Sequence, residues 1–419
     1  MVVGGGGREH AVIKKLKENK SIEKIYALPG NGGIAADAEC VSIGATDIDG
    51  IVKFAKENAI DFAVVTPDDP LVLGAVDALN GIGIKCFGPE KKAAIIEGSK
   101  VFSKNLMKKY GIPTAEYEVF SDMEKALEYL DTAPIPTVIK ADGLALGKGV
   151  IIAETREDAK SAVKSMMLDK VFGESGSNIV IEEFLTGPEV SVLSFTDGKT
   201  VVPMVSSMDH KRAKDNDEGL NTGGMGTVAP NPYYTKEVAD ECMKNIFLPT
   251  IKAMNQEGRT FKGCLYFGLM ITPNGAKVIE YNCRFGDPET QVVLPLLKTD
   301  LFTIMNAVAD GNLADLDIEF KDENACCVIM ASEGYPVKYE KGYEITVDSD
   351  VDGEIFIAGA AEKDSKLLTN GGRVLGVTCT AGTLPDAIEK SYKAVEKIHF
   401  GNAYYRRDIG AKALKAGEK

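Results

Sequence analysis

Short apolar runs alternate with amphipathic stretches through the first hundred residues of the chain. The apolar runs predict strands, and the stretches with apolar positions three and four residues apart predict helices. The predicted strands lie at 24–28, 61–66 and 85–87, and the predicted helices at 48–58 and 70–79. This alternation is typical of a parallel sheet with helices on both faces, so we expect a doubly wound N-terminal domain over 1–98.

The middle of the chain has shorter elements in an α+β order. A helix is predicted at 99–110, and a small α+β module follows it. Its strands are predicted at 116–120, 137–140, 147–153 and 178–183, and its helices at 122–130 and 156–168.

The remainder of the chain is richer in strands. The pattern predicts a hairpin of 189–195 with 200–205, a charged glycine-rich loop at 209–226, a helix at 236–256, a hairpin with its turn at 273–275 and a helix from about 290. From 325 to the end, a β-rich segment with a helix at 384–398 predicts a separate small domain. We therefore expect a multidomain protein that combines α/β and α+β parts.

Length, composition and charge narrow the possible functions. The 419 residues are enough for about three domains. The net charge of −14 argues against a broad nucleic-acid-binding surface but leaves room for a local phosphate site. No apolar run approaches the roughly 18 residues of a membrane helix. The N-terminus shows no signal peptide. We expect a cytoplasmic protein without nucleic-acid or membrane partners, and either a monomer or a homodimer.

Cysteine and histidine usage excludes further classes. None of the eight Cys forms a C-x-x-C motif and only three His are present, which argues against a zinc cage and against chemistry based on several histidines. Cys264, Cys326 and Cys327 stand inside apolar runs, so we expect them to be reduced and buried.

Two glycine-rich segments are candidates for phosphate binding. Gly4–Gly7 follows Val2 and Val3 and precedes a predicted helix, where backbone N–H groups can approach an anion; a tight turn is the alternative. The dinucleotide fingerprint fails because Glu9 occupies its third glycine position. In 140–149, two lysines flank a glycine-rich hairpin that suits a lid over polyphosphate, with a plain surface hairpin as the alternative.

The strongest local signal lies at 277–287. In a strand, alternate residues share a face, so we expect Glu280, Asn282 and Arg284 to point one way. The other face is then expected to carry Ile279, Tyr281 and Cys283. A carboxylate and an amide oxygen suit Mg²⁺, and an arginine suits phosphate. The alternative is a polar row that faces solvent. Asp287 and Glu289 follow on a Gly/Pro turn and add two further acids.

Two other segments are weaker candidates. The strand that ends at 182–189 carries acids that can meet an adenine amine and ribose hydroxyls, although exposed glutamates are the commoner case. The loop at 209–226 is rich in glycine and in both charge signs, as loops that close over substrates are; a mobile surface loop is the alternative. His210, in this loop, is by itself weak support for acid–base chemistry.

Together these segments closely resemble the phosphoribosylamine–glycine ligases, a family of the ATP-grasp superfamily, over essentially the whole chain. The motifs that carry the resemblance are GGREH (6–10), PGN (29–31), IKADGLALGKGV (139–150), EEFLTGPE (182–189), DHKR (209–212), NTGGMG (221–226), NCRFGDPETQ (282–291), GGRVLGVT (371–378) and RRDIG (406–410). The resemblance implies a two-lobed ATP-grasp fold between the N- and C-terminal domains. Its large lobe is 99–119 plus 190–324, its small lobe 120–189, and its C-terminal domain 325–419.

The resemblance also implies a reaction. ATP phosphorylates the carboxylate of glycine to give glycyl phosphate and ADP, and the amine of 5-phosphoribosylamine then forms glycinamide ribonucleotide. ATP with Mg²⁺ or Mn²⁺ is expected at the site. This step of purine biosynthesis needs charge neutralisation and alignment more than a strong base, which agrees with the small number of histidines.

Roles follow from the resemblance motif by motif. The ATP contacts are expected at Lys104, Lys140, Gly143, Gly147, Lys148, Glu182, Glu183, Phe184, Leu185 and Glu189, and the metal ligands at Glu280 and Asn282. The catalytic residues are expected to be Arg284, facing the γ-phosphate or the acyl phosphate, with Asp209 and Lys211. The two other substrates are expected to lie near Gly6, Gly7, Arg8, Glu9, Asn31, Asn221, Thr222, Gly223, Gly224, Asp287 and Glu289.

The chain departs from the family pattern at two places. Asp68 stands where the usual Gly-Pro-Glu segment has its glutamate, and we expect it to substitute. The strand at 263–271 lacks the additional carboxylate of many ATP-grasp enzymes, so fewer protein ligands are expected for the metal.

Three other functions are alternatives. A purine-pathway carboxylase that uses bicarbonate is the nearest, and 221–226, 282–291 and 406–410 favour the glycine ligase over it. A non-catalytic nucleotide sensor would not be expected to retain Lys104, Lys140 and the polar row. An NAD-dependent dehydrogenase is disfavoured by Glu9 and by the lack of an acid after the second strand.

Overall fold

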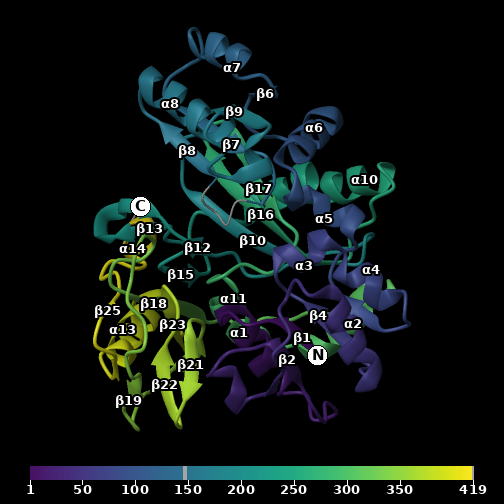
Figure 1. Cartoon of the computed structure of the whole chain (residues 1–419), viewed down its shortest axis with the longest axis vertical. Helices are drawn as coiled ribbons and strands as arrows, with labels where there is room; N and C mark the ends of the chain where they lie inside the picture. The colour runs from purple at the N-terminus through teal and green to yellow at the C-terminus, as the bar shows by residue number, and fades with distance from the viewer. Residues whose placement is uncertain (145–148, 418–419) are drawn as a thin grey trace.

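The computed structural model describes residues 1–144 and 149–417 (Figure 1). The N-terminal part is a parallel sheet in the order β3-β2-β1-β4-β5, as a doubly wound domain requires. Its strands are β1 (Val2–Gly4), β2 (Tyr26–Pro29), β3 (Glu39–Cys40), β4 (Phe62–Val65) and β5 (Lys85–Phe87). Helices α1 (Gly7–Leu16) and α2 (Ile48–Glu57) connect strands of this sheet. The strand order reverses between β1 and β4, and this is where such sheets bind ligands.

Two predicted helices differ from the observed ones. The helix predicted at 70–79 is divided into α3 (Asp68–Leu73) and α4 (Ala75–Asn80), because Gly74 has a left-handed φ of 97°. The helix predicted at 236–256 contains a π-helical turn over Met243–Phe247, between α9 (Lys236–Cys242) and α10 (Leu248–Gln256).

A helix that the sequence analysis did not predict, α5 (Lys91–Gly98), closes the N-terminal part. It leads directly into α6 (Lys100–Tyr110), whose first turn is capped by the hydroxyl of Ser99. The two helices form a corner between the N-terminal sheet and the rest of the chain.

The small α+β module is an antiparallel sheet in the order β6-β9-β7-β8, at the top of Figure 1. Its strands are β6 (Tyr117–Phe120), β7 (Thr137–Ala141), β8 (Val150–Ala153) and β9 (Ile179–Glu183), and its helices are α7 (Met123–Leu130) and α8 (Arg156–Met167). The predicted elements are confirmed here, except that 145–148 lie outside the described residues. The helices pack on the sheet through an apolar core of their own.

A second antiparallel sheet, in the order β11-β10-β16-β17, occupies the middle of the molecule. Its strands are β10 (Glu189–Thr196), β11 (Val201–Pro203), β16 (Gly263–Thr272) and β17 (Gly275–Asn282). Both predicted hairpins are confirmed. Two helices follow, α11 (Thr290–Leu296) and α12 (Leu301–Asp310).

The region predicted as the loop 209–226 contains strands. Met208–Asp209 (β12) pairs with Gly226–Ala229 (β15), and Arg212–Lys214 (β13) with Glu218–Asn221 (β14). The prediction of an irregular loop was wrong here, because these short strands are rich in glycine and charged residues and lack the apolar alternation that predicts strands. Both strands of the β13–β14 ribbon are exposed on much of their surface.

The C-terminal sheet has the order β12-β15-β18-β23-β20, so it takes two strands from before the predicted boundary at 325. Its later strands are β18 (Asn324–Ser332), β20 (Glu354–Ile357) and β23 (Arg373–Ala381), with β25 (Ala403–Tyr404) paired to β18. Helix α13 (Leu384–Val395) packs on the sheet and ends three residues before its predicted end, and α14 is Ala411–Gly417. The smaller pairings are β19 (Thr346–Val347) with β24 (Ile398–His399), and β21 (Ala360–Lys363) with β22 (Lys366–Thr369).

The cysteines follow the prediction. Cys264, Cys326 and Cys327 are buried in the cores, and all eight thiols are free in the part of the chain that the structure describes. Burial raises the pKa of the Cys327 thiol to about 12, which leaves it protonated and unreactive at neutral pH.

Two side chains of the N-terminal part bind the backbone of a C-terminal strand. The Ile357 N–H donates to His10 Nδ1 at 2.8 Å, and Asn31 Nδ2 donates to the Ile357 carbonyl at 2.9 Å. The Asn31 amide also donates to the Gly5 carbonyl at 3.0 Å, and its oxygen accepts from the N–H groups of Gly33 and Ile34. This side chain therefore joins the Gly4–Gly7 turn to β20.

Replacing Asn31 with Ala should destabilise the fold. The substitution removes the hydrogen bonds of the Asn31 side chain to Gly5, Gly33, Ile34 and Ile357 and leaves partly buried backbone groups without partners. We therefore expect the free energy of unfolding to fall by about 2 kcal/mol. Denaturant unfolding measures the loss. Asn58→Ala is the control, because within the described residues its exposed amide donates only to the Phe54 carbonyl, at 3.0 Å. An equal loss in both variants would contradict the prediction.

Candidate active site

The strand β17 carries the predicted polar row. Tyr281 and Cys283 point into the core and are almost fully buried, so Glu280, Asn282 and Arg284 lie on the opposite face. The predicted alternation is confirmed for 280–284. It is wrong for Ile279, which the pattern places with Tyr281 and Cys283, because an irregularity in the β16–β17 pairing leaves Ile279 without a partner and puts Val278 in the core instead. The neighbouring strand β16 carries no acid, and a register shift between Gly268 and Leu269 lies opposite Glu280.

Lysines from several elements surround the carboxylate of Glu280. Lys211 Nζ lies 3.7 Å from Glu280 Oε1 and 3.2 Å from Glu189 Oε2. Burial would raise the pKa of Glu280, but Lys211, Lys140 and Lys100 outweigh burial and hold this pKa below its ordinary value. Glu189 is the largest influence on Lys211 and, with Glu280, raises the pKa of that lysine well above its usual range. Glu280 is therefore ionised at neutral pH.

A second charged group joins α6, β7 and β9. Glu182 Oε2 lies 3.1 Å from Lys104 Nζ and 3.0 Å from Lys140 Nζ, and the three side chains are almost fully buried. Lys104 also donates to Thr114 Oγ1 at 2.7 Å, and Lys140 to the Ile279 carbonyl at 3.0 Å. Burial lowers the pKa of Lys104 to about 8. Glu182 Oε1 is buried and has no hydrogen-bond partner within 1–144 and 149–417.

The other predicted ATP contacts lie around this group. Glu183, the next residue along β9, is exposed, and its Oε2 lies 3.3 Å from Lys277 Nζ. Phe184 and Leu185 follow the strand and are half-buried. The Gly143 carbonyl accepts from Lys100 Nζ at 2.8 Å. Gly147 and Lys148, also predicted as ATP contacts, lie outside the described residues.

The turn at the reversal point of the parallel sheet is held by its own side chains. Glu9 accepts from the Gly6 N–H at 2.6 Å through Oε2 and from Arg8 Nε at 2.6 Å through Oε1. Arg8 Nη1 also donates to the Phe285 carbonyl at 3.3 Å, which brings the turn to the end of β17. Gly7, also predicted at the substrate, begins α1 and leaves no room for a Cβ beside Gln291 Nε2. A substrate role for these residues, and for Asn31, stays a prediction.

Three of the remaining predicted substrate residues, Gly223, Gly224 and Asp287, contact Arg373, a residue to which the sequence assigned no role. Arg373 Nη1 donates to the carbonyls of Gly223 and Asp287, at 2.8 Å each, and lies 3.3 Å from Asp287 Oδ1. Burial would raise the pKa of Asp287, but Arg373 and Arg8 hold it below its ordinary value. The guanidinium thus fastens the 221–226 segment to the turn after β17.

Asp209 lies beside this segment. A Cβ on Gly224, whose φ is 113°, would stand 2.6 Å from Asp209 Oδ1, so glycine permits the close approach. In the described part of the chain Asp209 Oδ1 is buried without a hydrogen-bond partner. Burial and the nearby Glu289 raise the pKa of Asp209 well above its ordinary value. Glu289 itself accepts from Ser191 Oγ at 3.3 Å.

The backbone around Lys211 holds the other two residues predicted from the 221–226 motif. Thr222 Oγ1 donates to the Lys211 carbonyl at 2.8 Å, and Asn221 pairs with Arg212 across the β13–β14 ribbon. These contacts connect the ribbon to the lysine that lies between Glu189 and Glu280.

Glu97, at the end of α5, is a second residue that sequence reasoning missed. Its Oε1 lies 3.1 Å from Arg284 Nη2, and its Oε2 accepts from the Cys283 N–H at 2.7 Å. Burial opposes the charge of Arg284, but Glu97 and Asp68 outweigh burial and raise the guanidinium pKa. The available signal was an acid at the end of the apolar run 93–96.

His210 is not placed for acid–base chemistry. It is almost fully buried, with Nδ1 3.1 Å from the Gly226 carbonyl and Nε2 accepting from the Gly410 N–H at 3.1 Å. Burial, with the nearby Arg406, lowers its pKa to about 4. Both ring nitrogens are therefore used to hold β12 and β15 to the C-terminal segment.

Several polar atoms of the site are buried without protein partners among the described residues: Glu182 Oε1, Asp209 Oδ1, Arg284 Nε and Gln291 Oε1. Such atoms can bind a polar ligand or water. Among the same described residues, five further ones lie outside the candidate site, on Ser194, Ser207, Tyr234, Thr378 and Asn402, so the four do not mark the site by themselves. The described residues include no group of three or more His, Cys, Asp or Glu side chains that could hold a metal ion by themselves. Glu280 and Asn282 fit a metal only if other oxygen ligands, such as phosphate, complete it.

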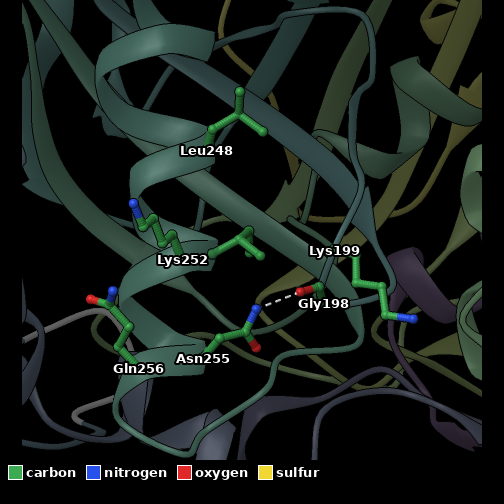
Figure 2. Close-up of a pocket in the computed structure, with 7 residues that line it drawn as sticks. Gly198, Lys199, Leu248, Lys252, Asn255 and Gln256 are labelled. Carbon is green, nitrogen blue, oxygen red and sulfur yellow. Dashed lines mark hydrogen bonds between the residues drawn. The ribbon is translucent and has the colours of Figure 1, made fainter.

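A groove of about 480 Å³ lies elsewhere, between α10 and the turn that joins β10 to β11. Figure 2 shows Leu248, Lys252 and Gln256 along the helix, and Asn255 donating to the Gly198 carbonyl at 2.7 Å. None of its lining residues belongs to the candidate site.

Comparison with known proteins assigns the family. Residues 1–97, 98–290 and 325–412 match the N domain, the ATP-grasp (A) domain and the C domain of phosphoribosylglycinamide synthetase, respectively. Over 410 residues the chain is 48% identical to the phosphoribosylamine–glycine ligase of Clostridium acetobutylicum, covering 98% of this chain and 99% of that protein. The chain belongs to the phosphoribosylamine–glycine ligase family.

Other relatives agree with this assignment. The phosphoribosylamine–glycine ligase of Pasteurella multocida is 47% identical, over 99% of this chain and 98% of that protein. The crystal structure of the Thermotoga maritima phosphoribosylamine–glycine ligase superposes with a TM-score of 0.87 at 36% identity, covering 97% of this chain and 99% of that one. The predicted family, fold class and ATP-grasp ligase activity are confirmed.

A more distant likeness concerns the fold alone. The biotin carboxylase domain of the Hydrogenobacter thermophilus 2-oxoglutarate carboxylase gives a TM-score of 0.74 at 17% identity, covering 100% of this chain and 93% of that one. No helix among the described residues has both the length and the apolar character needed to cross a bilayer.

The buried His210 makes stability depend on pH. Its folded pKa of about 4 lies below the ordinary value of 6.5, so the unfolded chain binds a proton that the folded chain does not. The stabilisation is complete above pH 6.5 and is lost as the pH falls toward 4. We expect the difference in unfolding free energy between wild type and His210→Gln to shrink by up to about 3 kcal/mol between pH 7 and pH 4. Denaturant titrations across this range would contradict the assignment if the difference stayed constant.

Proposed function

We propose that the site around β17 transfers the γ-phosphoryl group of ATP to the carboxylate of glycine and then joins the glycyl group to 5-phosphoribosylamine. In the first step a glycine carboxylate oxygen attacks the γ-phosphorus and the bond to ADP breaks. In the second, the amine attacks the glycyl carbonyl carbon and phosphate leaves, giving glycinamide ribonucleotide. The convergence of Glu280, Asn282 and Arg284 with lysines from α6, β7 and the segment after β12 carries the proposal.

The cationic side chains suit phosphoryl transfer. Lys104, Lys140 and Lys100 bring positive charge to the nucleotide phosphates, and Arg284, held at the end of β17, meets the γ-phosphate or the acyl phosphate. Glu182 positions two of these lysines through its ion pairs at 3.1 and 3.0 Å. Its unpartnered Oε1, within the described residues, is a suitable acceptor for the adenine amine. Phe184, Leu185 and Glu189 complete the nucleotide contacts.

Glu280 and Asn282 are the residues that would hold a divalent metal. An ionised carboxylate and an amide oxygen suit Mg²⁺ or Mn²⁺, and the cation would neutralise phosphate charge when it is bound. The biotin carboxylase domain of similar fold was crystallised with MgADP, which supports ATP with a divalent cation here.

Asp209, Lys211, Asp287 and Glu289 border the remaining space, next to the 221–226 segment that Arg373 fastens. We assign glycine and phosphoribosylamine to this side of β17, with the turn at 6–9 and Asn31 toward the phosphoribosylamine. The raised pKa of the buried Asp209 suits a group that interacts with an amine. Asp68, which raises the pKa of Arg284 together with Glu97, takes the place of the family's usual glutamate.

The wider predictions are part of the same proposal. We propose a cytoplasmic enzyme, a monomer or a homodimer, with small molecules as its partners. Its domains are 1–98, 99–119 plus 190–324, 120–189 and 325–419. Strands β12 and β15 belong to the 190–324 part of the large lobe and join it to the unit 325–419 through the C-terminal sheet.

A substrate-dependence assay tests the function. With ATP and Mg²⁺, ADP release is expected only when glycine and freshly generated 5-phosphoribosylamine are both present, with equal amounts of phosphate and a new amide. Release with bicarbonate instead of glycine would favour the carboxylase alternative. Tight ATP binding without ADP release would favour the nucleotide sensor.

Replacing Glu280 with Gln tests the metal assignment. The change keeps the side-chain shape but removes the charge, so we expect turnover to fall by roughly 10²–10³-fold while the unfolding temperature stays within a few degrees. The apparent affinity for Mn²⁺ in the presence of ADP, followed by electron paramagnetic resonance, should weaken in parallel. Glu118→Gln, an exposed position on β6, serves as the control; near-normal turnover in Glu280→Gln would overturn the assignment.

A further inference from the structure

One buried carboxylate contacts three consecutive residues at the end of β17. Glu97 Oε1 lies 3.1 Å from Arg284 Nη2, and Glu97 Oε2 accepts from the Cys283 N–H at 2.7 Å. With its amide nitrogen facing these acceptors, Asn282 donates to Glu97 Oε1 at 3.0 Å and to the Tyr281 carbonyl at 3.1 Å. The amide oxygen of Asn282 then points away from Glu97.

These contacts set the direction of the two functional side chains. Arg284 commits Nη2 to Glu97 and Nη1 to the Phe285 carbonyl at 3.1 Å, and its Nε has no partner among the described residues. The guanidinium is therefore held on one side and leaves donors for an anion. Asn282, held through its nitrogen, leaves its oxygen for a ligand.

Glu97 also stands at a corner that reaches the glycine-rich segment. Two residues after it, Ser99 Oγ donates to Asp142 Oδ1 at 3.0 Å, and Lys100 Nζ donates to the Gly143 carbonyl at 2.8 Å. The corner between α5 and α6 thus contacts the end of β17 on one side and the start of the segment 142–149 on the other.

We propose that Glu97 is a positioning residue for phosphoryl transfer, which orients Arg284 toward the γ-phosphate and Asn282 toward its ligand. This inference rests on the proposed function of the β17 site. Glu97 touches no reacting atom and acts through the two side chains that it holds. Its burial strengthens the effect, because a buried carboxylate and its guanidinium partner keep one arrangement in the absence of competing water.

Replacing Glu97 with Gln removes an acceptor without changing the shape. The carboxamide must turn its N–H₂ either toward the Cys283 N–H or toward Arg284 and Asn282. In both orientations a hydrogen-bond donor faces another donor, so one of the contacts of Glu97 is lost. We expect kcat to fall roughly 10²-fold with the KM for glycine nearly unchanged. Glu97→Asp, which keeps the charge but retracts it by one methylene, should lie between this variant and wild type.

A binding experiment separates positioning from general loss of stability. In metal-free buffer, calorimetry measures the affinities for ADP and for the non-hydrolysable ATP analogue AMP-PNP. Wild type should prefer the analogue by roughly tenfold, because Arg284 meets its γ-phosphate. Glu97→Gln should lose this preference. Retention of the preference in Glu97→Gln, or its absence in wild type, overturns the inference.

Thr250→Val is the matched control. Thr250 is fully buried, and its hydroxyl lies 2.9 Å from the Tyr281 hydroxyl, on the core side of the same strand. Its loss should lower the unfolding temperature as much as Glu97→Gln does, and leave both kcat and the nucleotide preference intact. A control that loses the preference equally would show that Glu97 acts only through stability.

A double-mutant cycle tests whether Glu97 acts through Arg284. If it does, Glu97→Gln combined with Arg284→Lys should reduce kcat no more than about threefold below Arg284→Lys alone. If the fold reductions in kcat of the two single variants multiply in the double variant, the inference is overturned. Failure of the proposed function is distinguishable from this result, because wild type would then show the nucleotide preference without substrate-dependent ADP release.

Discussion

The site depends on the alternation of side chains along β17. One face of this strand is fixed by the core, where Tyr281 and Cys283 are almost completely buried. The charged residues must therefore occupy the other face, and charges taken out of water are stable only with partners. Those partners come from α5, α6, β7 and the segment after β12, so the pairing of charges brings together distant parts of the chain.

Much of this arrangement is present in local sequence. The period-two pattern identifies the two faces of 280–284, although it fails at Ile279, where the pairing with β16 is irregular. The spacing of apolar residues identifies nearly all the strands of the first two sheets. Gly74 and the short strands at 208–229 were missed because a single left-handed residue or a two-residue pairing leaves little periodicity. The pattern of apolar residues therefore predicts neither the break at Gly74 nor the strands at 208–229.

The partners of the polar row could not be predicted in the same way. Glu97 lies 186 residues before Cys283, and Arg373 86 residues after Asp287, so no local spacing relates them. Their signal is indirect, since an acid or an arginine beside an apolar run must find a partner when it is buried. The same holds for His10 and His210, whose nitrogens bind backbone groups 347 and 200 residues away.

The C-terminal sheet has a consequence for synthesis on the ribosome. Strand β15 ends at Ala229, and its partner β18 begins at Asn324, so roughly a hundred residues are translated before this pair can form. Until then one edge of β15, whose four residues are all buried in the folded protein, lacks its partner strand, and an unpaired strand edge can associate with other nascent chains. The segment between them contains β16, β17 and α11, so the central sheet can fold before β18 is available to pair with β15. Codon usage and chaperone contact over this interval should therefore affect the yield of folded protein more than they would elsewhere in the chain.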